Sequence, residues 1–266
     1  MIRTIVNILH IGDIVGRPGR RIVENCLPNL CKEHQVDFVV ANGENAAGGM
    51  GITPDVAEEL YNQGIDVITT GNHIWDKKEI ISYLELDPRI IRPANYPPGT
   101  PGRGIVETMV QEIPLAVINL SGRVFMNTLD CPFRKAEELL ADYAGQNSII
   151  IVDFHAEATS EKQALARFLD GKVSAVVGTH THVQTADEQI LPKGTAYITD
   201  VGMTGPIDSV LGVRIELAVK RFLTQMPARF DVAGGPAQLN AVLLSIDTVS
   251  GKTISIQRVN SCEKQM

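Results

Sequence analysis

This sequence lacks several features that are typical of particular classes of protein, and their absence argues against those classes. Its four cysteines, Cys26, Cys31, Cys131 and Cys262, form no CxxC pair and have no histidine at zinc-finger spacing. We therefore expect free thiols in a reducing compartment rather than a disulfide framework or a structural zinc site. Aromatic residues make up only 5% of the chain, and no basic stretch interleaved with aromatics indicates an RNA-binding module.

Long hydrophobic runs are also absent. The first apolar run, from Ile5 to Ile11, is interrupted by Asn7 and His10 and leads directly into Gly12-Asp13 without a cleavage site. It is too short to span a membrane and does not resemble a signal peptide. We interpret it as a first β-strand and expect a cytoplasmic protein with no membrane partner.

Positive charge is scarcer than negative charge. Lysine and arginine number 24 against 31 acidic residues, which gives a net charge of −7. An acidic chain repels nucleic-acid backbones and anionic membranes. An extended nucleic-acid surface is therefore not expected, but a small phosphate ester is compatible with the charge if bound cations supply local positive charge.

The length and the order of elements favour one α/β domain over residues 1–266. A domain of this size buries roughly 70–75% of its unfolded surface, so no metal is needed merely for folding. Short apolar runs predict strands, and amphipathic stretches between them predict helices. The predicted strands are 5–11, 38–41, 67–70, 106–110, 115–120, 149–154 and 173–177, with a hairpin of 239–246 and 253–257. The predicted helices begin near Pro18 and after an N-cap at Thr53, and cover 77–84, 134–143, 162–169 and 216–223.

This order indicates a layered α/β fold with a mixed sheet or two stacked sheets. A closed eight-fold β/α barrel is the structural alternative, since the length suits it. The alternation of strands and helices breaks between Pro93 and Leu120 and again after Gly194, which argues against the barrel.

Polar residues that can bind metal gather where predicted strands end. They are Asp13 in HIGD, Glu44 and Asn45 in NGEN, Asn72 and His73 in TGNH, His155 in DFH, and His180 and His182 in VVGTHTH. In open α/β sheets, sites form at the carboxyl ends of strands, so these residues could meet in one cleft. Glycines at 12, 43, 71 and 178 suit tight turns beside them.

Each of these residues also has an ordinary structural role. Asp13 could cap a helix, Glu44 could be an exposed loop acid, and Asn72 could form a turn. A single histidine is more often a hydrogen-bonded structural residue than a ligand. Four of the six histidines, however, lie just past strand ends. The other two, His10 within a strand and His34 at a helix end, are expected to be buried and solvated, respectively.

The side-chain types of the candidate ligands restrict which metal ions could bind. Carboxylate, amide and imidazole groups without thiolate suit manganese, iron, zinc, cobalt or nickel rather than a structural zinc cage. An acid that bridges two metals about 3.5–4 Å apart is the arrangement used in metal-assisted phosphate hydrolysis.

The order of these motifs resembles a known superfamily. GD, GE, GNH, a lone H and HTH are similar to the pattern of the calcineurin-like metallophosphoesterases. The strings GDIVGRPGR, NGENAAGG, TGNHIWD, DFHAEATSEK and VVGTHTHVQTAD resemble more closely the YmdB-like family of bacterial phosphodiesterases, over essentially the whole chain.

The resemblance implies a four-layer α-β-β-α sandwich with two mixed sheets, a di-iron site in which manganese or zinc could substitute, and activity on 2′,3′-cyclic nucleotides. It implies one metal held by Asp13, Glu44, Asn45 and His182, and another held by Glu44, Asn72, His155 and His180, with His73 as proton donor. Many superfamily members have Asp-x-His at the first motif, but Val15 stands here. The histidine ligand of that motif is therefore missing, and Asn45 or water would take its place. The bridging acid is Glu44 instead of the commoner aspartate. Both features recur in the YmdB-like family.

The resulting hypothesis is in-line attack of a metal-bridging hydroxide on phosphorus, with His73 protonating the departing sugar oxygen. Arg17, Trp75 and the 202–212 loop are weaker candidates for substrate contact, because each also has an ordinary role in a helix start, in packing or in turns. A phosphomonoesterase or protein phosphatase could use the same metals. A regulator that binds a nucleotide or RNA end with slow turnover is a further alternative, and a homo-oligomer is possible.

Overall fold

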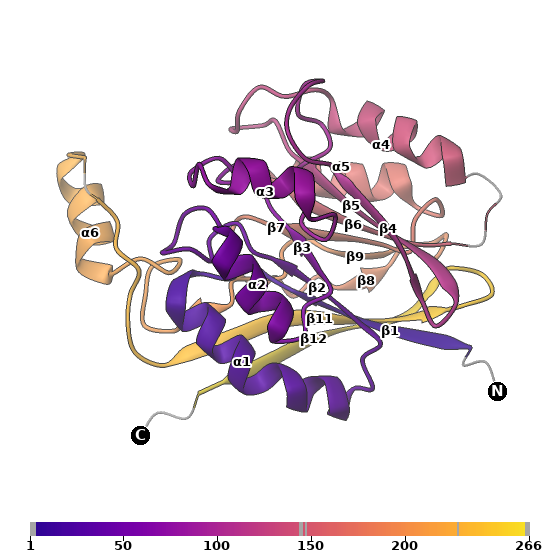
Figure 1. Ribbon diagram of the computed structural model, residues 1–266, viewed down its shortest axis with the longest axis horizontal. Coiled ribbons are helices and arrows are strands. Elements are labelled where there is room, and N and C mark those ends of the chain that lie inside the picture. The colour runs from indigo at the N-terminus through magenta and orange to yellow at the C-terminus, as the bar shows by residue number, and fades with distance from the viewer. Residues whose placement is uncertain (1–3, 144–145, 147, 228, 264–266) are drawn as a thin grey trace.

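Two mixed β-sheets lie face to face, and helices cover their outer faces (Figure 1). This computed structural model describes residues 4–143, 146, 148–227 and 229–263. The first sheet has the order β10-β11-β1-β2-β3, with β12 also paired to β11, and the second has the order β4-β5-β6-β7-β9-β8. The predicted sandwich of four layers with two mixed sheets is confirmed, and the barrel alternative is wrong.

The first sheet combines parallel and antiparallel strands. Its members are β1 (Ile5–Ile11), β2 (Phe38–Asn42), β3 (Val67–Thr69), β10 (Gly205–Pro206), β11 (Ala237–Asp247) and β12 (Thr253–Cys262). β1, β2 and β3 are parallel, and the β11–β12 hairpin runs antiparallel beside β1. The carboxyl ends of β1, β2 and β3 therefore meet at one edge.

The second sheet brings four parallel strands to the same region. Its members are β4 (Ile105–Val110), β5 (Ile113–Ser121), β6 (Ile149–His155), β7 (Ala175–Thr179), β8 (Gln189–Ile190) and β9 (Ala196–Ile198). β5, β6, β7 and β9 are parallel, whereas β4 and β8 pair antiparallel at the two edges.

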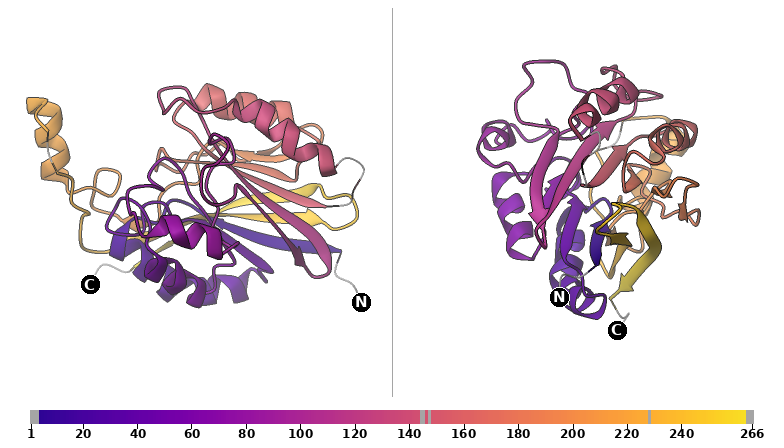
Figure 2. Two further views of the ribbon diagram at one scale, coloured as in Figure 1. Left: turned by 45° about the horizontal axis from the view of Figure 1, so that its top comes forward. Right: turned by 90° about the vertical axis from the view of Figure 1, so that its right-hand side faces the viewer.

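Helices bury their apolar faces on the outer side of each sheet. α1 (Gly16–Glu33), α2 (Pro54–Asn62) and α3 (Ile80–Leu86) share a core with the first sheet. α4 (Pro132–Leu140), followed by a 3₁₀ turn at Ala141–Tyr143, and α5 (Thr159–Leu169) share one with the second. α6 (Ile215–Thr224) projects from the body in Figure 1 and in the left view of Figure 2. The helices in the described part of the chain are all too short or too polar to cross a membrane.

The space between the sheets changes from apolar to polar along the strands. Successive residues of a strand point to opposite faces, so alternate positions share the gap. Near the amino ends this gap holds Ile8, Val67, Val117 and Ile151. Two residues further along the same strands stand His10, Thr69, Asn119 and Asp153, all fully buried. The polar layer therefore leads toward the edge where the predicted ligands lie.

Some details differ from the sequence prediction. The helix predicted at 77–84 begins only at Ile80, because residues 72–79 form turns after the GNH motif. The strand predicted at 173–177 is shifted to Ala175–Thr179, and the short strands β8, β9 and β10 were not predicted. His34 is half-buried at the end of α1, where its carbonyl accepts a hydrogen bond from Asn7, and is not simply solvated. His10 is buried and the four cysteines are free, as predicted.

The close approach of β7 to the segment after β9 leads to a stability prediction. A methyl group at Gly178 would overlap the carbonyl oxygen of Thr199, so the backbone must move. We expect Gly178→Ala to lower the free energy of unfolding by about 2–3 kcal/mol, as overpacking does in a closed core. Gly234→Ala is the matched control, because its added methyl meets no described atom within 4 Å. Urea unfolding of both variants checks this, and equal stabilities would contradict it.

Candidate metal centre

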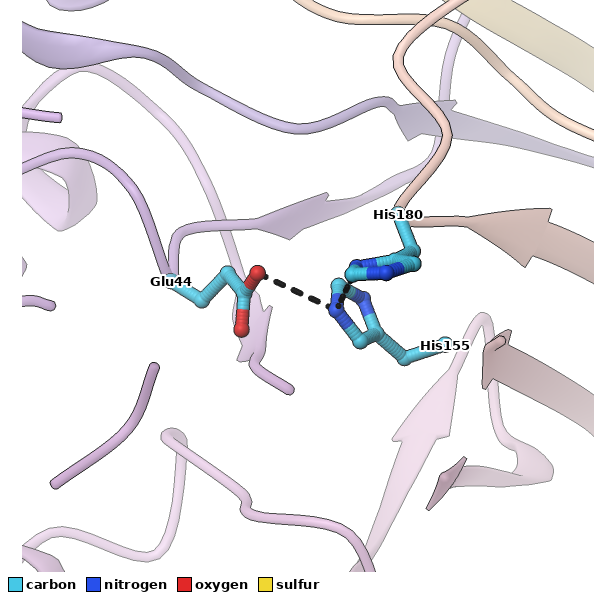
Figure 3. A group of neighbouring side chains, drawn as sticks. All are labelled: Glu44, His155 and His180. Atoms are coloured by element: carbon cyan, nitrogen blue, oxygen red, sulfur yellow. Dashed lines mark hydrogen bonds and ion pairs between the residues drawn. The ribbon is translucent and has the colours of Figure 1, made fainter. Parts of the chain in front are cut away.

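Three ligand atoms from different segments converge on one nitrogen of His155, at the end of β6. Its Nε2 lies 3.1 Å from Glu44 Oε1, 3.0 Å from Asn72 Oδ1 and 3.0 Å from His180 Nδ1. Figure 3 shows Glu44 approaching His155 from the left and His180 lying above it. One ring nitrogen carries at most one hydrogen and cannot bond to all three. Atoms bound to one cation at about 2.0–2.2 Å stand roughly 3 Å apart, so this cluster fits a metal.

A second group of polar atoms lies beside the first. His182 Nε2 is 3.7 Å from Asp13 Oδ1 and 3.3 Å from the side-chain amide of Asn45. The same amide lies 3.3 Å from Glu44 Oε1. Asp13 Oδ1 is buried and has no hydrogen-bond partner among the described residues. A buried carboxylate oxygen without a donor is costly, and a cation at this point would compensate it.

Glu44 lies between the two groups. Its Oε1 faces His155, and its Oε2 accepts a hydrogen bond from the backbone N–H of His73 at 3.0 Å. Burial alone would raise the pKa of Glu44, but the charge of His155 and their hydrogen bond outweigh it and lower the pKa to about 2. Glu44 is therefore ionised, which is the form in which a carboxylate could bind a cation.

Asp13 has a different electrostatic environment. Burial raises its pKa to about 6, against the opposing effect of His182 and His155. Its Oδ2 accepts a hydrogen bond from the backbone N–H of His180 at 3.1 Å, which fixes the carboxylate next to the histidine loop. A metal would favour the ionised form of Asp13, because its positive charge opposes the effect of burial.

The orientation of His155 is fixed by its second ring nitrogen. Nδ1 donates to Thr179 Oγ1 at 3.0 Å, and Thr179 Oγ1 donates to Asp153 Oδ1 at 2.7 Å. Although burial opposes it, the charge of Glu44 raises the pKa of His155 to about 9, so without a cation Nε2 is protonated as well. A cation at the cluster would take the place of the Nε2 proton, while Nδ1 keeps its own. Hydrogen bonds of this kind set the tautomer of metal-binding histidines.

His180 and His182 are oriented in the same manner. His180 Nε2 lies 3.2 Å from Glu157 Oε2, so its Nδ1 is free to face the cluster. Burial, followed by the charge of His155, lowers the pKa of His180 to about 3 and keeps its ring neutral. His182 Nδ1 donates to the carbonyl of Leu211 at 3.1 Å, which leaves its Nε2 pointing toward Asp13.

The loop that carries these two histidines is strained and firmly held. His180 has φ +93° and His182 has φ +66°, values that non-glycine residues rarely adopt. The fully buried Lys162 donates to the carbonyl of Thr179 at 2.8 Å and to Asp200 Oδ2 at 2.9 Å. The same Asp200 oxygen accepts the backbone N–H of Thr181 at 3.0 Å. These bonds offset the cost of the unusual backbone.

His73 lies next to this cluster and is half-buried. Its Nδ1 donates to Asp76 Oδ2 at 2.7 Å, and its backbone contacts Glu44. Of the weaker candidates, Arg17 is exposed and lines a cavity of about 420 Å³ together with Arg229 and Phe230. Trp75 packs edge-on against Tyr96 with ring centroids 5.5 Å apart. Leu211, in the 202–212 loop, contacts the candidate ligand His182.

The residues that support the predicted ligands were not predicted from the sequence. They are Asp76, Asp153, Glu157, Lys162, Thr179 and Asp200. A signal existed for Asp153, which stands two residues before His155 on the same face of an otherwise apolar strand. Thr179 shares that face of the neighbouring strand, level with His155.

A solved structure of low sequence identity shares the fold of this chain. The NAD nucleotidase of Haemophilus influenzae superposes with a TM-score of 0.62 at 14% identity, covering 96% of this chain and 55% of that one. At this identity the likeness concerns the fold alone.

More similar proteins define the family. The family described as "YmdB-like protein" matches residues 9–259, and the chain therefore belongs to the YmdB-like family. The 2′,3′-cyclic-nucleotide 2′-phosphodiesterase of Bacillus subtilis (strain 168) is 53% identical over 254 residues, or 96% of each chain. A phosphatase from Mycoplasma pneumoniae superposes with a TM-score of 0.93 at 34% identity, covering 98% of this chain and 95% of that one. A protein from Thermus thermophilus superposes with a TM-score of 0.92 at 43% identity, covering 97% of this chain and 100% of that one.

The hydrogen bonds behind His155 lead to a prediction for metal affinity. Thr179→Val removes the acceptor of His155 Nδ1 and the donor to Asp153 with little change in shape. We expect metal affinity to fall by about 10–100-fold, the usual cost of losing such a partner.

Thr195→Val is the matched control for this prediction. Thr195 is also buried, and its Oγ1 donates to the Val173 carbonyl and accepts from the Gly171 N–H. Its loss should cost about 1–3 kcal/mol of stability, as unpaired buried groups do, while metal affinity is unchanged. Competition with a fluorescent chelator measures both affinities, and equal metal binding by the two variants would exclude a role for Thr179.

Proposed function

We propose that this chain is a metal-dependent phosphodiesterase that hydrolyses 2′,3′-cyclic nucleotides. The observation that carries the proposal is the convergence of Glu44, Asn72 and His180 on His155 Nε2. The B. subtilis relative, whose name states this activity, supports the substrate class. Small cyclic phosphodiesters are accordingly the proposed partners.

The candidate ligands divide into two overlapping sets. One comprises Asp13, Glu44, Asn45 and His182, and the other comprises Glu44, Asn72, His155 and His180. Two bound cations, iron by resemblance or manganese or zinc in its place, would neutralise phosphate charge and lower the pKa of a water to roughly 7. A strong protein base is then unnecessary.

His73 is the residue that we assign to proton transfer. Asp76 accepts its Nδ1 proton and Glu44 holds its backbone, so the ring is fixed in direction. Its Nε2 can then deliver a proton to the sugar oxygen that leaves phosphorus. Such general-acid help is typically worth about 10²–10⁴ in rate.

This role predicts a dependence on the leaving group. His73→Ala should retain two metals per chain but lose about 10²-fold or more in kcat on 2′,3′-cyclic AMP, whose leaving alkoxide needs a proton. On bis-p-nitrophenyl phosphate the loss should be much smaller, because p-nitrophenolate departs without one. Metal analysis together with both assays checks this. An equal loss on the two substrates would show that His73 acts in another way.

The substrate class is tested with three nucleotides side by side. Metal-loaded protein should open 2′,3′-cyclic AMP in preference to 3′,5′-cyclic AMP and 5′-AMP, as judged by chromatography of the products. Activity on 5′-AMP alone would favour the phosphomonoesterase alternative. Binding of all three without turnover would favour a regulatory nucleotide-binding protein. Either result would overturn the diester assignment.

A further inference from the structure

A cavity of about 540 Å³ lies at the end of the second sheet opposite the candidate metal centre. Ser148 and Ile150, at the start of β6, help to line it, whereas His155 ends the same strand. β6 has 7 residues, so the two places are separated by roughly 20 Å at about 3.3 Å per residue. The cavity therefore shares no residue with the proposed catalytic site.

Positive charge gathers around this cavity in a chain that is otherwise acidic. Lys172, Lys193 and Lys252 line it, and Glu137 is the acidic residue that lines it as well. Within the described part of the chain, no ion pair joins any of the three lysines to a carboxylate. The Lys172 ammonium lies 4.5 Å from the centre of the Phe168 ring. The carboxylate of Asp170 also accepts the backbone N–H of Lys193 at 3.2 Å. Three cations near these two acids leave an excess of one positive charge.

Two lysine side chains lie against glycines of neighbouring loops. A Cβ at Gly171 would stand 2.8 Å from Lys193 Cβ, and one at Gly194 would stand 2.8 Å from Lys252 Cδ. Both glycines have positive φ, +83° and +103°, so any other residue there would be strained as well as crowded. Part of each lysine stem thus lies against the backbone, although both lysines are exposed to solvent.

Hydrogen bonds tie these loops together. The Gly171 N–H donates to Thr195 Oγ1 at 2.9 Å, and the Gly194 carbonyl accepts from the Thr253 N–H at 3.1 Å. The Ser174 hydroxyl donates to the Gly251 carbonyl at 2.6 Å. The backbone of the loops that carry the lysines is therefore held in place before any ligand binds.

A buried hydroxyl at this cavity has no partner. Ser148 Oγ is buried without a hydrogen bond among the described residues, although its residue lines the cavity. Buried polar groups in native proteins are nearly always hydrogen-bonded, and exceptions require an explanation. A ligand that accepts a hydrogen bond from this hydroxyl would provide one.

We propose that this cavity binds a small phosphate-bearing anion with at least two negative charges. Lysine ammonium groups bind phosphate as point charges, and Ser148 would donate to one of its oxygens. The volume lies within the roughly 300–1,000 Å³ of small-molecule sites. The site is separate from the one proposed to hydrolyse cyclic nucleotides, and its occupancy does not depend on turnover.

Calorimetry with inorganic phosphate tests the proposal. Manganese-loaded protein at low salt should bind phosphate at the lysine cavity in addition to any phosphate at the metals. In the K193Q/K252Q variant the cavity component should be lost or weakened at least about tenfold, since two of its three cations are gone. The rate on 2′,3′-cyclic AMP should be unchanged in this variant. The control variant K32Q/K220Q, which removes two lysines elsewhere on the surface, should bind as the original chain does.

A second variant separates a specific site from general charge attraction. Ser148→Ala keeps every lysine, and we expect it to weaken phosphate binding at the cavity several-fold. Identical binding isotherms for the original chain and K193Q/K252Q would overturn the proposal. Full retention of affinity in Ser148→Ala would also overturn it, because only non-specific attraction to lysines would remain. Both variants change partly exposed residues, and circular dichroism confirms that each is folded.

Discussion

Burial of negative charge between the two sheets is the constraint on which the rest of the structure depends. Asp13, Glu44 and Asp153 are fully buried, and an isolated carboxylate in such surroundings would be too costly to keep ionised. Asp153 is compensated by hydroxyl donors and by His10, whose Nε2 lies 3.6 Å away across the gap, so its pKa falls despite burial. Asp13 retains an oxygen without any donor among the described residues. The need for cations is thus greatest at the carboxyl ends of the strands.

The same constraint explains why the supporting residues are so tightly connected. A metal site requires each imidazole to present a lone pair, and the wrong tautomer would present a hydrogen instead. Thr179, Glu157 and the Leu211 carbonyl each take one ring proton, so the three histidines all face inward. The buried pair of Lys162 and Asp200 then fixes the loop in its strained form. Preorganisation of this kind lowers the cost of binding a metal.

Most of the fold and the candidate ligands could be predicted from the sequence, because both depend on local patterns. Apolar runs predict strands. A polar residue just past such a run lies at the carboxyl end of the strand, whatever path the following loop takes. The supporting contacts could not be predicted in this way. The bond from Thr179 to Asp153 depends on the register of two strands, and the contact of Leu211 with His182 depends on the path of a loop. The two- and three-residue strands β8, β9 and β10 carry too few residues for a periodic signal.

The lysine cavity is the clearest example of a feature that local sequence patterns cannot predict. Lys172, Lys193 and Lys252 are far apart in sequence, and nothing in the motif around any of them indicates a site. They meet because the start of β7, the β8–β9 turn and the β11–β12 turn share one end of the molecule. The parallel strands place acids and histidines at their carboxyl ends. Their amino ends lie beside other loops, and these loops carry the three lysines. The common direction of β6 and β7 accordingly separates the buried candidate metal centre from the surface cavity that we propose to bind an anion.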